Sequence, residues 1–371
     1  MSQQDNPLRR LNAAGQSVWY DNIQRAMLTS GELARLIAQD DLRGVTSNPS
    51  IFEKAIAGSH DYDAALKQQQ RLHPEFSSRE LFHELALEDI GAAADLLLPV
   101  YNATAGVDGM VSLEVSPDLA YDTAATLREA RELHARLARP NVMIKVPATE
   151  AGLPAIEQLI ADGININVTL LFAVPRYEQV VEAYLRGLER RLEQAQAIDR
   201  IASVASFFVS RLDTLLDPLL AQRCPELQGT IAIANAKWAY ERFQALFGGE
   251  RFAPLAAAGA RPQRLLWAST STKNPAYPDV LYVETLVGPQ TVNTMPPATY
   301  VAFRDHGRVE QTLARDLELA KAQLARLPNL GIDLAQATAQ LEAEGVAAFA
   351  QAFEQLLGTL DAKVANLAAT A

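Results

Sequence analysis

The stretch NVMIKV, residues 141–146, is a short apolar run with one lysine inside it, and its composition is that of a buried strand. Similar β-rich runs recur along the chain, and a longer helical pattern separates each from the next. The eight runs are SVWYD (17–21), GVTSN (44–48), MVSLEV (110–115), NVMIKV (141–146), INVTLL (166–171), IASVASFF (201–208), RLLWAST (264–270) and YVETLV (282–287). Eight strands that alternate with helices predict parallel strands closed into a barrel.

Segments between the runs carry apolar residues at helical spacing. The clearest of them are 81–101, 119–138, 177–197 and 234–247. The connection 55–105 is long, so we expect two or more helices in it. From about residue 309 the chain is expected to be helical almost to Ala371, with a break at Pro328-Asn329.

We therefore expect an α/β fold: a single eight-stranded parallel (β/α)8 barrel of the TIM type, with additional helices in the early insertion and at the C-terminus. Residues 1–371 would form one domain, with a barrel core at about 15–300 and C-terminal helices at about 309–368. The alternative is a doubly wound open sheet, but no G-x-G-x-x-G motif follows the first strand.

The composition is that of a globular protein, with 371 residues of which 49% are hydrophobic and 21% charged. The net charge of −11 disfavours nucleic-acid binding, and no apolar stretch is long enough for a membrane span. The N-terminal MSQQDNPLRR lacks the apolar run of a signal peptide, and the single cysteine, Cys224, fits a reducing compartment, so we expect a cytoplasmic location. The five histidines show no metal-ligand spacing, and we expect no metal.

Polar residues gather at the carboxyl ends of the predicted strands, where the active site of an α/β barrel lies. In chain order they are Asp21; Thr46, Ser47 and Asn48; Glu114; Lys145; Asn167 and Thr169; Ser206 and Arg211; Ser269, Ser271 and Lys273; and, after the predicted eighth strand, Thr291 and Asn293. This joint pattern favours a functional site over a set of unrelated surface residues.

Lys145 lies between two apolar residues, where a charged amine is costly unless it is paired or its pKa falls. A buried lysine of that kind is a good nucleophile toward carbonyl groups. Asp21 and Glu114, from other strands, could supply acid and base catalysis.

Each of these residues could also have a purely structural role. Lys145 could extend to solvent, with Glu114 as a structural ion-pair partner. Asp21 could cap the helix that follows it. Asn48 could be a turn residue before Pro49, and Arg211 and Lys273 could be surface cations.

Five motifs, taken together and in this order, resemble the transaldolase family, and the resemblance covers roughly residues 10–300. They are GVTSNPSIFEKAI (44–56), VSLEVSPDLAYD (111–122), NVMIKVPAT (141–149), INVTLLF (166–172) and SVASFFVSRLD (203–213). The length and the long early insertion resemble the larger bacterial branch of that family.

The resemblance implies a role for each matching residue. Lys145 would form a Schiff base, and Asp21 would take and return the proton during carbon–carbon cleavage. Glu114 would act through a water held by Thr169. The substrate-binding residues would be Asn48, Asn167 and Ser206 for the dihydroxyacetone unit, and Arg211 and Ser271 for the phosphate.

Two departures from the family pattern stand out. STSTKN (269–274) replaces a motif like ASFRN, so Lys273 stands where the family has a phosphate-binding arginine. Lysine supplies a positive charge but cannot form the bidentate hydrogen bonds of a guanidinium group. Trp19 and Tyr20 replace smaller residues before Asp21, and they either shape the wall of the site or pack in the barrel.

The implied function is transfer of a dihydroxyacetone unit between sugar phosphates in the pentose phosphate pathway, with no cofactor, by a monomer or homodimer. One alternative is a lyase that releases free dihydroxyacetone, but related aldolases carry a tyrosine where this chain has Phe208. A non-catalytic sugar-phosphate binder is disfavoured because Asp21, Glu114 and Lys145 occur together, and a metal-dependent barrel enzyme lacks its ligands.

Overall fold

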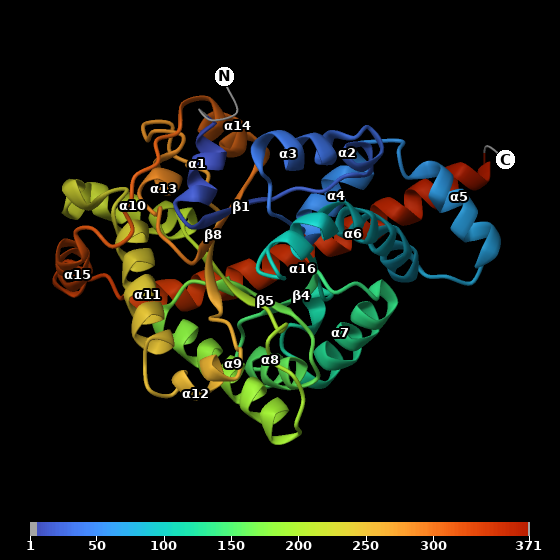
Figure 1. Cartoon of the computed structure of the whole chain (residues 1–371). Helices are drawn as coiled ribbons and strands as arrows, with labels where there is room; N and C mark the ends of the chain where they lie inside the picture. Colours follow the sequence, from blue (N-terminus) through green and yellow to red (C-terminus); the bar gives the residue numbers. More distant parts are fainter. Residues whose placement is uncertain (1–5, 370–371) are drawn as a thin grey trace.

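The fold is a closed barrel of eight parallel strands, as expected, in a computed structural model that describes residues 6–369 (Figure 1). The strands follow one another around the barrel in chain order, and β1 closes the ring by pairing with β8. Their bounds are β1 (Gln16–Tyr20), β2 (Gly44–Thr46), β3 (Met110–Glu114), β4 (Val142–Pro147), β5 (Ile166–Leu171), β6 (Ser203–Phe208), β7 (Arg264–Ala268) and β8 (Thr291–Met295).

Helices occupy the connections, and the early insertion 55–105 contains two complete helices, in agreement with the expected two or more. The break predicted at Pro328-Asn329 is also present, as a single 3₁₀ turn over Pro328–Leu330. The helices are α1 (Pro7–Ala13), α2 (Arg25–Thr29), α3 (Glu32–Asp40), α4 (Pro49–Ala57), α5 (Asp63–Leu72), α6 (Ser78–Ala103), α7 (Thr123–Leu137), α8 (Gly152–Ala161), α9 (Val174–Glu193), α10 (Ser210–Arg223), α11 (Ile231–Phe247), α12 (Ala253–Ala257), α13 (Leu281–Glu284), α14 (Pro297–His306), α15 (Leu317–Arg326) and α16 (Leu334–Ala369). None of the helices within residues 6–369 combines the length and hydrophobicity that a bilayer crossing requires.

The predicted position of the eighth strand was wrong. YVETLV (282–287) begins in the one-turn helix α13, and the hydroxyl of Tyr282 donates a hydrogen bond of 2.8 Å to buried Asp213, which ties the segment to α10. Tertiary contacts of this kind override a high β-propensity. The true strand is TVNTM, so Thr291 and Asn293 lie inside β8 and not after a strand.

Strand β8 was not predicted because its composition is polar, whereas buried strands of parallel sheets are usually apolar throughout. Most of its polar side-chain atoms find partners inside the protein, although the amide nitrogen of Asn293 has none among the described residues. The side-chain oxygen of Asn293 accepts a hydrogen bond from Thr270, and the hydroxyls of Thr294 and Thr46 lie 2.7 Å apart. Buried hydroxyls and amides are tolerated in a core when they are paired in this way.

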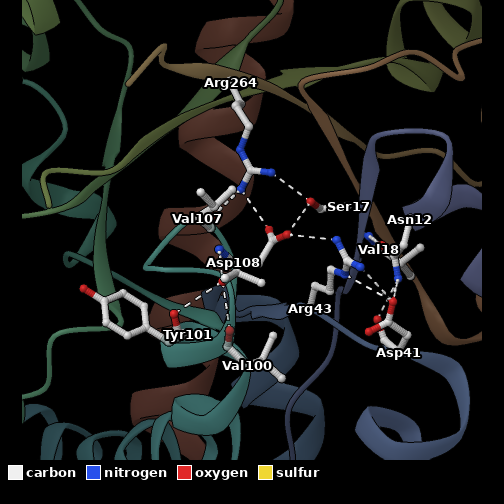
Figure 2. A network of polar contacts seen from close by, with 11 residues as sticks. Asn12, Ser17, Val18, Asp41, Arg43, Val100, Tyr101, Val107, Asp108 and Arg264 are labelled. Atoms are coloured by element: carbon white, nitrogen blue, oxygen red, sulfur yellow. Dashed lines mark hydrogen bonds and ion pairs between the residues drawn. The ribbon is translucent and has the colours of Figure 1, made fainter. Parts of the chain in front are cut away.

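A polar network around Asp108 closes the amino-terminal end of the barrel (Figure 2). The buried carboxylate of Asp108 accepts hydrogen bonds from Ser17 at 2.8 Å and from Arg264 at 2.9 Å, and it forms an ion pair of 3.5 Å with Arg43. These four residues lie near the beginnings of β1, β2, β3 and β7. The network therefore joins strands that are far apart in the sequence, at the end opposite to the predicted site.

The long C-terminal helix α16 crosses the other end of the barrel and appears as the red helix in Figure 1. It contacts α4, α6, α10 and β5, and its apolar face buries Leu341, Phe349 and Phe353. Because α4 and α10 follow directly after β2 and β6, α16 packs onto the elements that carry strand-end residues.

Candidate active site

A cavity of about 490 Å³ opens at the carboxyl ends of the strands. Its lining contains most of the residues that the sequence nominated: Asp21, Asn48, Lys145, Thr169, Ser206, Phe208, Arg211, Ser271 and Lys273. Glu114 and Asn167 lie behind this lining and contact Lys145 and Ser206 respectively. Of the other strand-end residues, Thr46 and Ser269 also line the cavity, whereas Ser47, Thr291 and Asn293 do not. The barrel geometry thus brings residues from seven different strand ends to one place.

Lys145 lies at the base of the cavity and does not extend to solvent, because its side chain is only 6% exposed. Its amine donates a hydrogen bond of 2.9 Å to the carbonyl oxygen of Ser47 and lies 3.2 Å from Oε2 of Glu114. The pairing of the strands sets this contact, since Glu114 on β3 and Lys145 on β4 are partners in register.

Glu114 contacts the lysine, and Thr169 on the neighbouring strand β5 lines the same cavity. Burial raises the pKa of Glu114, and the charge of Lys145 opposes that rise. The hydroxyl of Thr169 is buried, and it has no hydrogen-bond partner among the described residues. A buried polar group without a partner is uncommon in a folded protein, and here it belongs to a residue that lines the cavity.

Asp21 is the residue directly after β1, and it does not cap the helix that follows. That helix, α2, begins after Gln24, which makes no capping bond with its side chain. The carboxylate of Asp21 instead accepts a hydrogen bond of 2.7 Å from Thr46. Burial raises the pKa of Asp21, while Lys145 and this hydrogen bond oppose the rise. A carboxyl group with a raised pKa is suited to proton transfer.

Amide and hydroxyl groups line the wall beside the lysine. Asn167 donates a hydrogen bond of 3.0 Å to Ser112 and accepts one of 2.6 Å from Ser206, so its amide is held in place. Asn48 uses its side-chain oxygen to cap α4 by accepting from the backbone of Ile51. Its amide nitrogen remains available to the cavity that Asn48 lines. The turn residue predicted from Asn48-Pro49 is thus a helix cap that also faces the site.

Two further cations, Arg211 and Lys273, line the same cavity as Lys145. Arg211, on the first turn of α10, stacks over the ring of Phe208 with 5.0 Å between the guanidinium carbon and the ring centre. Burial lowers the pKa of Arg211. Lys273 donates a hydrogen bond of 2.7 Å to Ser271, and its pKa is lowered by burial and by the nearby charges of Arg211 and Lys54.

Several lining residues escaped the sequence interpretation, and Lys54 and Phe349 are two of them. Lys54 comes from α4, and Phe349 comes from α16, far along the chain. Neither follows a strand, so a search of strand ends does not find them. The aromatic pair before Asp21, in contrast, packs in the core and does not line the cavity: Tyr20 contacts Tyr300, and Trp19 fills the space where Gly44 has no side chain.

The geometry suits addition of an amine to a carbonyl group. Lys145 has a carboxylate in contact and a second carboxylate, Asp21, across the cavity, and the cations can bind an anionic group of the same substrate. Among residues 6–369, no group of three or more histidine, cysteine or acidic side chains is arranged to hold a metal ion.

Comparison with known proteins agrees with this geometry. The family described as Transaldolase/Fructose-6-phosphate aldolase matches residues 18–360. A transaldolase of Parafrankia sp. is 48% identical, over 98% of this chain and 99% of its own length. A transaldolase of Neisseria gonorrhoeae is 47% identical, over 95% of this chain and 99% of its own, and transaldolase 2 of Nostoc sp. is 45% identical, over 97% and 98%.

Proposed function

The chain belongs to the Transaldolase/Fructose-6-phosphate aldolase family, and from that premise we propose that it carries its substrate as a Schiff base on Lys145. Its activity is that of a transaldolase. A dihydroxyacetone unit passes from a ketose phosphate, sedoheptulose 7-phosphate or fructose 6-phosphate, to an aldose phosphate, glyceraldehyde 3-phosphate or erythrose 4-phosphate, in the non-oxidative pentose phosphate pathway. The contact of 3.2 Å between the Lys145 amine and Glu114 is the observation that carries the residue assignment.

The first step joins enzyme and donor. The amine of Lys145 passes a proton to Glu114 and adds to the keto carbon, C2. Glu114 then returns a proton to the hydroxyl of this carbinolamine, which leaves as water, and a protonated imine forms. Burial raises the pKa of Glu114, which favours its holding that proton between the two transfers. The hydroxyl of Thr169 has no hydrogen-bond partner among the described residues. We assign it the role of holding a water molecule through which Glu114 exchanges these protons.

The second step breaks the carbon chain. Asp21 removes the proton from the C4 hydroxyl, the C3–C4 bond breaks, and its electron pair moves into the imine to give an enamine on Lys145. The aldose phosphate leaves, and the enamine adds to the aldehyde carbon of an acceptor while Asp21 returns its proton to the new hydroxyl. Hydrolysis of the imine frees the product. The imine accepts the electron pair, so the sequence of steps uses no cofactor.

The remaining polar residues divide by their chemistry. We assign the amide and hydroxyl groups of Asn48, Asn167 and Ser206 to the hydroxyls of the dihydroxyacetone unit, since Asn48 and Ser206 line the cavity and Ser206 is hydrogen-bonded to Asn167. We assign Arg211, Ser271 and Lys273 to the phosphate, because two of them are cations and the third is hydrogen-bonded to Lys273. The single cysteine fits a reducing cytosol, where we place the reaction.

A fructose-6-phosphate aldolase is the second candidate, because the family includes such enzymes. A lyase must protonate the enamine and release dihydroxyacetone to water. Phe208, which lines the cavity, presents a phenyl ring that cannot relay a proton, and this favours transfer to an acceptor.

The decisive experiment incubates the protein with fructose 6-phosphate, with and without erythrose 4-phosphate, and follows glyceraldehyde 3-phosphate in a coupled NADH assay. Sustained turnover only with acceptor supports transaldolase, since the enamine must wait for an aldehyde. Turnover without acceptor, together with free dihydroxyacetone, would make the protein a lyase. An inactive protein would refute the catalytic assignment of Lys145 and leave a sugar-phosphate binder.

A further inference from the structure

The charges that line the cavity are strongly one-sided. Asp21 is the only acidic residue of the described lining, against four cationic residues: Lys54, Lys145, Arg211 and Lys273. This excess occurs in a chain whose net charge is −11. Lys145 has Glu114 as its counterion, so three further positive side chains share the lining of one cavity. Like charges placed together repel one another, and a bound anion removes that repulsion.

Lys54 is the one cation of this set that has no role in the proposed reaction. It lies on α4, and it shares one helical face with Ser50 and Ile51, which also line the cavity. No hydrogen bond or ion pair connects the Lys54 side chain to any other residue of the described part of the chain, whereas Lys273 is held by Ser271. Its ammonium group is therefore free to bind a ligand.

The helix that carries Lys54 is fixed in position. Asn48 caps its amino terminus, Phe52 and Ile56 are buried on its opposite face, and α16 packs along it. The base of the Lys54 side chain thus has one defined position beside the cavity, and only the flexible stem moves. The charge of Lys54 also reaches the cation cluster, because it contributes to the lowered pKa of Lys273.

We propose that Lys54 is a third cation for the substrate phosphate and acts with Arg211 and Lys273 to make the enzyme selective for phosphorylated sugars. A phosphate carries close to two negative charges and three acceptor oxygens, so three donors can bind it at once. Lys273 carries a point charge and cannot bind two phosphate oxygens at once, as the bidentate guanidinium group of an arginine does. A phosphate oxygen therefore remains for Lys54 to bind. This inference rests on the proposed function, since it names a further determinant of the same site.

The test measures selectivity for the phosphate group in one half of the reaction. With fructose 6-phosphate as donor, kcat/KM is determined for erythrose 4-phosphate and for erythrose as acceptors, by following glyceraldehyde 3-phosphate. In a two-step transfer, kcat/KM for the acceptor reports only the step after the donor product has left. The ratio of the two values therefore isolates the contribution of the acceptor phosphate.

We expect Lys54→Gln to lower this ratio about tenfold, which corresponds to one hydrogen bond with a charged group. Lys54→Arg should keep most of the selectivity. The matched control is Lys67→Gln, which removes the same charge from an exposed lysine on α5 outside the cavity and should leave the ratio as it is. Inorganic phosphate should act as a competitive inhibitor. Of the three variants, only Lys54→Gln should show weaker inhibition than the wild type.

Three results would overturn the inference: an unchanged ratio in Lys54→Gln, an equal loss with both acceptors, or the same loss in Lys67→Gln. The first would make Lys54 a solvated surface lysine, the second would place its effect outside phosphate recognition, and the third would indicate general attraction of anions. A wild-type enzyme without transfer activity would refute the proposed function itself, and so the two failures are distinguishable.

Discussion

The amine of Lys145 and the carboxylate of Glu114 lie 3.2 Å apart, on residues that are direct partners across strands β3 and β4. This pairing delivers a nucleophile and its proton acceptor together. Replacing Lys145 with Ala should abolish covalent trapping of fructose 6-phosphate by borohydride, because no other amine in the cavity has such a partner. Mass spectrometry of the reduced protein measures the adduct.

Lys273→Ala is the control for this experiment, since Lys273 lines the same cavity and sits beside Ser271. At saturating substrate it should still give the adduct, with the label on the peptide that contains Lys145. An adduct that persists in Lys145→Ala, or that moves to Lys273, would refute the assignment of the Schiff base.

Asp21→Asn should separate the two chemical steps. Asn cannot take the C4 proton, so release of glyceraldehyde 3-phosphate should fall by about 10²- to 10⁴-fold. Imine formation depends on Glu114, so borohydride trapping should persist.

In the wild type, the base Asp21 must be ionised, and its pKa is raised by burial. The rate should therefore fall as the pH drops through a pKa above the ordinary value of 3.8, and this acid limb should be absent from the residual rate of Asp21→Asn.

A different result would assign the roles differently. If Asp21→Asn lost trapping and cleavage equally, Asp21 would act in imine formation or in folding. A thermal melt distinguishes these two cases.

The strand pattern alone predicted seven of the strands and the cluster of residues at their ends. This succeeded because a strand buried on both faces is apolar throughout, and a barrel brings all its carboxyl ends together. It failed at β8, where Thr291 and Asn293 are paired inside the protein. It also missed Lys54 and Phe349, because the packing of α4 and α16 places them and no local pattern encodes that packing.

Phe208→Tyr should increase the release of free dihydroxyacetone in the absence of an acceptor. The new hydroxyl would stand in the cavity wall beside Arg211 and could relay a proton to the enamine. We expect an increase of roughly 10- to 100-fold, at or below the usual contribution of one positioned acid–base group. Phe349→Tyr is the control, since it adds a hydroxyl elsewhere in the same cavity. An increase of equal size in both variants would show that cavity polarity, and not the position of residue 208, controls release.

Asp108→Asn should destabilise the barrel without altering substrate binding. The change removes a buried charge and leaves Arg43 and Arg264 without their shared counterion (Figure 2). Breaking a buried ion pair in this way costs about 3–5 kcal/mol, which urea unfolding would measure. Asp118→Asn, which breaks an exposed pair with Arg79, should cost less than about 1 kcal/mol. KM for fructose 6-phosphate should stay unchanged in Asp108→Asn, since the network lies at the opposite end, and a raised KM would contradict this separation.

Asp213 should make stability fall as the pH rises toward neutrality. Burial raises its pKa to about 7, although the backbone of Ala232 and the hydroxyl of Tyr282 donate hydrogen bonds to it. Between the ordinary pKa of 3.8 and about 7, the folded protein keeps a proton that the unfolded chain has lost, so the free energy of unfolding decreases by about 1.4 kcal/mol per pH unit. Asp213→Asn imitates the protonated carboxyl and has no such dependence. Its stability relative to the wild type should therefore rise from pH 5 to pH 7 and level off above, in urea unfolding at each pH. A constant difference from pH 5 to pH 8 would show that Asp213 is ionised in the folded protein throughout.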